Sequence, residues 1–551
     1  MSLLGLLTFG VVSGQEKELV ITEILGFSDY YKMGSWTPLS VLLQNRGKTV
    51  DGWLEVILTS GSEFKGNIRE TVYRKKIVLP TGSQKLFSFS LPIDSPVFPL
   101  QINIWHNESL VGSKSVSVKD QFTDKQLVLL LDDSLTARLF SFLPEQYLGI
   151  HSSPIYLPEH WISYQGVAAI VSDVDSILDL RSQQFQAMKE WVTSGGQLYL
   201  TGRFDPGTLK ESKIKQLVSE GMLMWTGSQT TANFETTGQR DQWRPRKSLL
   251  TYSDPGLDET GLQTILVNNL PNRGVDFFIV LSGSLVGLIL LFYIKKDLVK
   301  KSESFKRQII RVMLILGMFT VLASACYLKQ KSAYSPFISG FTLIDKKMND
   351  SRVWVDHQLG FFSLFSGSYS FDRESDHATV SLGKSELSSH VQGADLVIEE
   401  AEEKIRITVN QANWSHRFLK FGMVDHLDIK GNLVLKKESL LVNLNNSSLY
   451  TLTDIDLVFE GKHIKLGEIE PGSVIRKSFK RTEMQATRTS PSNNGVAEQL
   501  VRTIQYRFNE KKEPVLSGII RGYPLPISFG KNEVSPYDHK TILIWKLNLE
   551  S

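Results

Sequence analysis

The stretch VDFFIVLSGSLVGLILLFYI, residues 275–294, and a second apolar run at 309–328 decide the architecture that this sequence predicts. Phe277 to Ile294 has no charge over about 18 positions, the lower end of the length that spans a hydrocarbon core of about 30 Å. Both runs are apolar on every face rather than along one stripe. They predict a hairpin of two transmembrane helices, at 275–294 and 309–328. The alternative is a pair of buried core helices in a large soluble protein.

The loop between the two runs, 295–308, predicts the orientation of the hairpin. Only Asp297 and Glu303 oppose seven cations in and just after it. These cations are Lys295, Lys296, Lys300, Lys301, Lys306, Arg307 and Arg311. Short loops rich in Lys and Arg stay in the cytoplasm. We therefore expect the loop to be cytoplasmic, and the parts of the chain before and after the hairpin to be extracytoplasmic.

Composition and the N-terminus agree with soluble domains on a small anchor. The chain has 551 residues and a formal net charge of +3, with no basic field suited to nucleic acid. Its single cysteine, Cys326, lies in the second apolar run, so no disulfide can form within the chain. Residues 1–15 are apolar and then small, which is typical of a secretion signal. An ordinary first strand is the alternative.

Three larger regions flank the hairpin. Residues 16–120 contain short β-rich runs separated by Gly and Pro turns, which predicts a β-sandwich. Residues 121–255 contain apolar runs at 127–131, 167–171 and 197–202, with a helical pattern between the last two, which predicts a parallel α/β domain. Residues 335–551 predict a C-terminal β-rich domain with one helix near 496–508. The expected fold class is thus multidomain α+β.

A faint internal similarity links the two β-rich regions. Residues 39–91 show a strand, an Asn-containing turn, a strand and then Pro80-Thr81-Gly82-Ser83 before a further strand. Residues 440–479 show the same order, with Glu470-Pro471-Gly472-Ser473 at the corresponding place. Either one sandwich topology is used twice, or the similarity is chance likeness between β-sandwiches.

The α/β region resembles a known family in the stretches Gly166–Asp173 and Glu190–Gly202. They are similar to the class I glutamine amidotransferase-like, flavodoxin-like fold, and specifically to uncharacterised bacterial membrane-anchored proteins with such a domain beside β-sandwiches. Catalytic members carry a cysteine nucleophile after the strand that matches Leu198–Gly202. This sequence has Thr201 as the only hydroxyl residue there, and no His-x-Glu pair follows. The resemblance therefore implies a degenerate domain without enzymatic activity.

Four carboxylates at the ends of the predicted parallel strands are the candidate site. The carboxyl ends of strands are where ligands bind in open α/β sheets, and paired carboxylates there hold divalent cations. Capping of the following helices is the alternative role. The candidates are Asp132, Asp133, Asp173 and Asp175. No histidine pattern has metal-ligand spacing, and no cofactor is expected.

Together these features predict an envelope protein of the bacterial cytoplasmic (inner) membrane. The expected partners are the lipid bilayer and an envelope protein or a second copy of the chain, and not nucleic acid. The expected role is that of a non-enzymatic scaffold or interaction subunit. The alternative is a ligand- or metal-binding sensor, or a hydrolase, that uses the carboxylates of the α/β domain.

Overall fold

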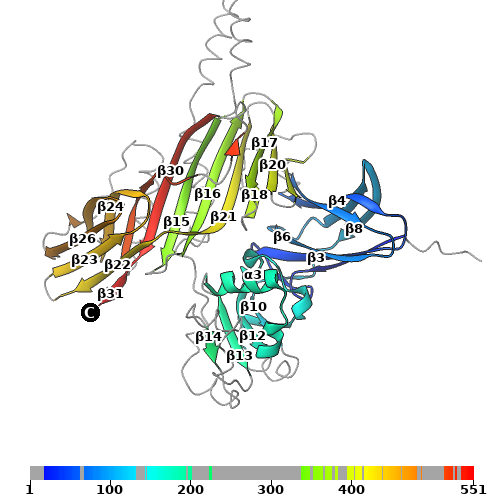
Figure 1. The fold of residues 1–551 in the computed structure, drawn as a ribbon, viewed down its shortest axis with the longest axis horizontal. Helices are drawn as coiled ribbons and strands as arrows, with labels where there is room; N and C mark the ends of the chain where they lie inside the picture. Colours follow the sequence, from blue (N-terminus) through cyan, green and yellow to red (C-terminus); the bar gives the residue numbers. More distant parts are fainter. Residues whose placement is uncertain are drawn as a thin grey trace, which may run out of the picture.

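The computed structural model shows three β-sandwich regions in a row, with a smaller α/β region against one side (Figure 1). It describes residues 18–61, 68–131, 143, 145–193, 196–201, 223–225, 337–347, 352–363, 366–374, 379–382, 394–401, 404–411, 415–436, 439–460, 462–480, 485–486, 514–524, 528–529 and 535–550. The three sandwich regions are called the N-terminal, central and C-terminal sandwiches below.

The N-terminal sandwich forms because its strands alternate apolar and polar residues, so that one face of each strand can be buried. Leu39, Val41 and Leu43 are fully buried on one strand and pack with Leu54 and Ile102 from the opposite sheet. One sheet has the order β1 (Leu19–Leu25), β3 (Trp36–Asn45) and β6 (Gln84–Pro92). The facing strands are β5 (Arg69–Leu79), β4 (Val50–Ser60), β7 (Leu100–His106) and β8 (Ser109–Val116). The short strands β2 (Tyr31–Lys32) and β9 (Phe122–Thr123) pair with each other.

The α/β region contains a five-stranded parallel sheet, and the strands predicted near 127, 167 and 197 are all present in it. The spatial order is β11 (Tyr147–His151), β10 (Gln126–Leu130), β12 (Val167–Asp173), β13 (Gln197–Thr201) and β14 (Leu223–Trp225). In chain order this is 2-1-3-4-5, the order of flavodoxin-like sheets. The accompanying helices are η1 (Pro154–Tyr156), η2 (Trp161–Tyr164), α2 (Val174–Leu178) and α3 (Ser182–Thr193).

The central sandwich is built from strands that follow residue 336. One of its sheets contains β15 (Phe337–Lys347), β16 (Arg352–Ser363), β21 (Ser415–His426) and β18 (Thr379–Leu382). The other contains β19 (Leu396–Ala401), β20 (Lys404–Gln411), β17 (Gly367–Glu374) and β29 (Ser528–Phe529). Phe361, Phe371 and Phe421 meet between the sheets and belong to the same apolar core as the N-terminal sandwich.

The C-terminal sandwich has an apolar core of its own, which includes the fully buried Trp545. Its smaller sheet has the order β26 (Ser473–Lys480), β23 (Ser439–Asn446), β22 (Ile429–Leu435) and β31 (Asn548–Glu550). The facing strands are β30 (Ser535–Lys546), β28 (Val515–Arg521), β24 (Thr451–Phe459), β25 (Lys462–Ile469) and β27 (Gln485–Ala486).

Two parallel strand pairs fuse the three sandwiches into continuous sheets. β19 of the central sandwich pairs with β5 of the N-terminal sandwich, with Val397 opposite Val72 and Ile398 opposite Tyr73. The result is one eight-stranded sheet made from parts of the chain more than 300 residues apart. β15 likewise pairs with β30, which extends the other central sheet into the C-terminal sandwich. The junctions are therefore hydrogen-bonded sheet rather than flexible linkers.

The similarity between the two β-rich regions is a true structural repeat. In both outer sandwiches the first and fourth strands of the repeat pair in one sheet (β3 with β6, β23 with β26), and the second and third pair in the other (β4 with β5, β24 with β25). β7 and β8 correspond in order and direction to β28 and β30. The interpretation that one topology is used twice is confirmed.

A buried asparagine makes equivalent hydrogen bonds to the backbone in each repeat. The side-chain Nδ2 of Asn45 donates to the carbonyl oxygens of Lys48, Leu79 and Pro80. Asn446 makes the matching bonds to the carbonyls of Tyr450, Ile469 and Glu470. The backbone oxygen of each asparagine accepts from a turn glycine at 2.7 Å, Gly82 or Gly472, and both glycines have positive φ, +75° and +72°. Only glycine adopts this conformation without strain, which explains the shared Gly-Ser sequence.

The α/β region is held against the outer face of β3 and β6. The Ser90 and Ser163 hydroxyls are 2.6 Å apart, and the backbone N–H of Trp36 donates to Gln165 Oε1. Trp161 also meets Trp354 of β16 edge-to-face, with ring centroids 5.0 Å apart. Contacts with both the N-terminal and the central sandwich fix the position of this region.

The predicted fold class, multidomain α+β with a two-helix hairpin, is wrong. Of the described residues 68% lie in strands and 8% in helices, with only two α-helices, so the fold is β-rich. The period-two alternation of apolar residues on both sides of the predicted hairpin accounts for this result, because it buries one strand face at a time. Descriptions of the molecule as transmembrane or amidotransferase-like are corrected with it.

Within the described ranges, no helix combines the length and the apolar character needed to cross a membrane. The predicted location in an inner membrane is corrected on this finding. Several predictions lie outside the described residues: the signal at 1–15, the apolar runs at 275–294 and 309–328, the loop at 295–308 with its seven cations, and the helix near 496–508.

Candidate functional site

Of the four carboxylates predicted as a ligand site, the structure describes Asp173 and Asp175. Asp173 ends β12, and its Oδ1 accepts a hydrogen bond from the backbone N–H of Ser176 at 3.1 Å, so it caps α2. Asp175 is exposed in the first turn of the same helix. Asp132 and Asp133 lie outside the described residues. Among the residues that are described, no group of three potential metal ligands occurs.

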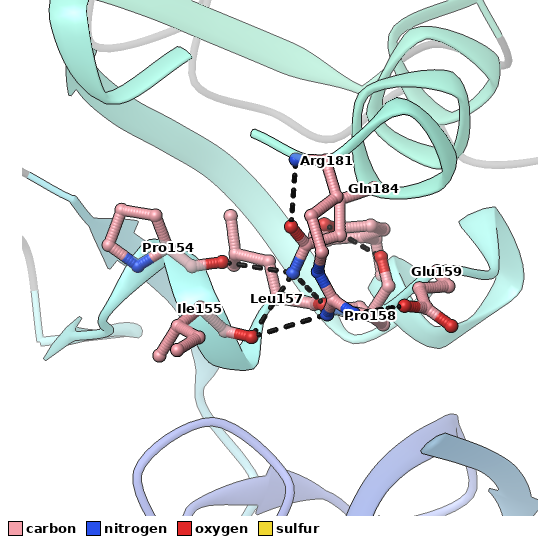
Figure 2. A network of polar contacts seen from close by, with 8 residues as sticks. Pro154, Ile155, Leu157, Pro158, Glu159, Arg181 and Gln184 are labelled. Atoms are coloured by element: carbon pink, nitrogen blue, oxygen red, sulfur yellow. Dashed lines mark hydrogen bonds and ion pairs between the residues drawn. The ribbon is translucent and has the colours of Figure 1, made fainter. Parts of the chain in front are cut away.

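The loop that follows β11 is fixed to α3 by one buried glutamine (Figure 2). Gln184 is 1% exposed, and its Nε2 donates to the carbonyl oxygens of Pro154, Ile155 and Leu157 at 2.8–3.2 Å. Its Oε1 accepts from the backbone N–H of Arg181. The Arg181 guanidinium forms an ion pair with Glu159 at 2.7 Å. This network supplies donors to three carbonyl groups of the loop and ties the loop to α3 at the carboxyl edge of the parallel sheet.

The outer face of the eight-stranded sheet bears a row of alternating charges across the junction. We call Glu55, Arg74, Glu399, Arg406 and Asp372 the charged row; they come from β4, β5, β19, β20 and β17, which are neighbours in the sheet. Arg74 contacts Glu55 at 2.8 Å and Glu399 at 3.2 Å. Arg406 contacts Asp372 at 2.9 Å and lies opposite Glu399 in the register of β19 and β20.

The charged row changes from buried to exposed along its length. Glu55 is 4% exposed and also accepts from Trp105 Nε1 at 2.9 Å, so its carboxylate is fully engaged. Burial acts to lower the pKa of the Arg74 guanidinium, but the hydrogen bonds and negative charges of Glu55 and Glu399 outweigh it, so the pKa is raised. The hydrogen bond from Arg406 lowers the pKa of Asp372. Both pKa shifts favour the charged forms of Arg74 and Asp372, and the row presents both signs of charge to solvent.

A His–Thr–His cluster links the neighbouring strands β15, β16 and β30; Thr342 and His357 are buried, and His539 is partly buried. The hydroxyl of Thr342 is 2.6 Å from Nδ1 of His357 and 2.8 Å from Nε2 of His539. Because one hydroxyl has one proton, one imidazole donates to Thr342 and the other accepts from it. Burial, with the charges of His539 and Arg373 as further causes, lowers the pKa of His357 to about 3. This imidazole is therefore neutral and structural at physiological pH.

A buried ion pair connects the two central sheets to the N-terminal sandwich. Arg417 on β21 donates from Nη2 to Oδ1 of Asp395 at 2.6 Å, and both side chains are almost fully buried. The second carboxylate oxygen of Asp395 accepts from the backbone N–H of Glu70, just before Thr71 of the β5–β19 register. One aspartate thus satisfies a charge across the sandwich and a backbone donor across the junction.

Sequence analysis did not find the charged row, the His–Thr–His cluster or the Asp395–Arg417 pair. The pairing of β5 with β19 brings the charged row together. The pairing of β15 with β16 and β30 brings Thr342 to the two histidines. The Asp395–Arg417 pair forms across the central sandwich. The repeated Asn and Gly-Ser positions were the only sequence signal that pointed toward this arrangement.

The chain was compared with known proteins. Residues 19–119 match the model of a domain of unknown function, DUF8726. A search of curated proteins gives no match. The yeast δ-COP-I μ-homology domain, solved with a Dsl1 WxWxV peptide, is 10% identical, with a TM-score of 0.20 over 39% of this chain and 96% of that one. Red sea bream transglutaminase is 9% identical, with a TM-score of 0.10 over 38% of this chain and 31% of that one.

Proposed function

We propose that this chain is a non-enzymatic scaffold that binds a protein partner through its β-sandwich surfaces. The observation that carries the proposal is the pairing of β19 with β5, which makes one eight-stranded sheet from two distant parts of the chain. A continuous sheet holds its outer face at fixed spacing, because hydrogen bonds rather than linkers set the distance between the sandwiches. This rigidity is what a docking platform requires, since little order is lost on binding.

The charged row is the part of this platform best suited to partner recognition. It presents Glu399, Arg406 and Asp372 with partial exposure of their side chains, at 26%, 58% and 42%. Alternating charges on a surface favour partners with the complementary pattern and disfavour others. The α/β region, fixed by its contacts with β3, β6 and β16, adds a second surface at a constant position.

The test is isolation of the full chain with its partner from the source cells after brief chemical cross-linking. We expect cross-linked peptides that map to the outer face of the eight-stranded sheet. A variant with Arg406→Glu and Asp372→Arg reverses the exposed pair and should weaken recovery of the partner. Lys430→Glu, at an exposed ion pair with Asp428 in the C-terminal sandwich, is the matched control. Repeated isolation of the chain alone, or equal recovery with the reversed pair, would contradict the proposal.

A further inference from the structure

The strand β8 ends the eight-stranded sheet on the side away from the central sandwich. Within the described residues it is paired on one side only, with β7. Two large apolar residues on it face solvent: Leu110 is 51% exposed and Val111 is 43% exposed. Edge strands with exposed apolar residues are templates for pairing with another strand.

The structural repeat shows what covers the corresponding edge of the C-terminal sandwich. β30 occupies the position in the C-terminal sandwich that β8 occupies in the N-terminal one. The outer edge of β30 is covered by β15, which runs parallel to it over eleven paired residues, Phe337 to Lys347. We propose that the outer edge of β8 binds an extended segment of a partner protein as an added parallel strand. This inference rests on the proposed scaffold function and specifies how the partner binds.

The residues that face β8 from the opposite sheet indicate which side chains the added segment carries. A Cβ placed on Gly112 would lie 3.1 Å from Leu19 Cδ2 and 3.5 Å from Ile21 Cδ1, so the open end of the sandwich is apolar there. Leu19 and Ile21 are only partly buried and pack against the N-terminal core. Side chains of an added strand alternate between the two faces, so every second residue of the segment would cover these two positions. The segment should therefore be apolar at alternate residues.

Lys114 limits what can bind at the far end of β8. Its side chain turns inward, forms an ion pair with Glu23 and donates to the carbonyl oxygen of Ile21 at 3.2 Å. Inward-pointing charges on edge strands oppose indiscriminate pairing. The charge of Lys114 thus disfavours general aggregation at this end of β8.

The direction of the added strand distinguishes the proposed segment from a second β8 strand. Two β8 strands related by a two-fold axis would pair antiparallel, because in a self-complementary contact residue i of one copy faces residue j of the other, and j faces i. The β30–β15 pair is parallel. A parallel segment is therefore not a second β8 strand.

The experiment uses the full chain and a synthetic peptide with the sequence of β15, residues 337–347, as the probe strand. One peptide carries a photoreactive group at its first residue, and another carries it at its last. Parallel addition predicts that the first labels the Ser109–Leu110 end of β8 and the second labels the Ser115–Val116 end. The same peptides with Thr342→Pro, which removes a backbone donor, should label neither end.

Edge variants complete the test. Leu110→Lys with Val111→Lys should weaken peptide binding by about tenfold, because lysines on an edge oppose strand addition. Val474→Lys is the control, since Val474 is 57% exposed on β26, an end strand of another sheet. Labelling with the opposite polarity, labelling away from β8, no labelling, or a β8–β8 dimer would each overturn the proposal. None of these results bears on whether a partner is recovered from cells, so the scaffold proposal stands or falls separately.

Discussion

Removing the carboxylate of Asp395 should destabilise the joined sheets more than any exposed substitution. The change leaves the Arg417 guanidinium, on a side chain 2% exposed, without its carboxylate at 2.6 Å. Breaking a buried ion pair in this way typically costs about 3–5 kcal/mol. The backbone N–H of Glu70 also loses its acceptor at 3.1 Å, which adds about 1 kcal/mol. We therefore expect Asp395→Ala to lower the free energy of unfolding by roughly 4–6 kcal/mol.

The assay is urea denaturation of the full chain, with a matched exposed pair as the control. Asp372→Ala removes the same kind of Arg–Asp hydrogen bond on the same sheet, but its side chains are 42% and 58% exposed. An exposed pair is worth about 0–1 kcal/mol, so this variant should unfold close to the original protein. Asp395→Leu combined with Arg417→Met should recover most of the loss, because two apolar groups leave no uncompensated charge. Equal stabilities of the two alanine variants would refute the reasoning.

Three further predictions concern other buried groups. His357 has a folded-state pKa of about 3, below its ordinary 6.5, so its stabilising contribution is complete above pH 6.5 and falls as the pH drops toward 3. Between pH 7 and 4.5 the original protein should lose roughly 2–3 kcal/mol more than His357→Gln in urea denaturation, and parallel pH profiles would argue against this assignment. Asn45→Ala and Asn446→Ala should each cost about 2–3 kcal/mol by the same assay, because each removes a buried amide that donates to three carbonyl groups, of which Pro80 and Glu470 keep bonds from Ser83 and Ser473, and a large difference between the two variants would count against equivalent roles. Gln184→Ala should speed hydrogen exchange in residues 154–159 by at least about tenfold without changing β12, whereas unchanged exchange there would show that the loop does not depend on this side chain.

Local features of the fold were predictable from the sequence, and long-range pairing was not. Strands such as Leu198 with its neighbours, and the helix that contains Met188, follow from apolar periodicity and turn residues. The repeat was visible because Asn45 and Asn446 each precede a Gly-Ser turn that their backbone oxygens help to close. The prediction for Asp173 named two roles, and geometry was needed to assign it to capping.

The dominance of strands was missed because the predicted fold class was built around two helices at the apolar runs 275–294 and 309–328. The pairing of Val72 with Val397 could not be predicted, since either valine fits any buried strand and a parallel neighbour leaves no local signal. The charged row follows from that pairing, so it was equally hidden. Arg74 reads as an ordinary surface cation until Glu399 is placed beside it.

The pairing of β5 with β19 joins the N-terminal and central sandwiches, and a cysteine cross-link measures it directly. In a Cys326→Ser background, Val72→Cys and Val397→Cys place two thiols opposite each other in the register. With a protease site inserted between Ser228 and Gln229, oxidation should keep the two cleaved halves joined on a non-reducing gel. Val72→Cys with Glu400→Cys, three positions out of register, should leave them separate. Separation of the in-register pair, or equal joining of both pairs, would contradict the joined sheet and the scaffold built on it.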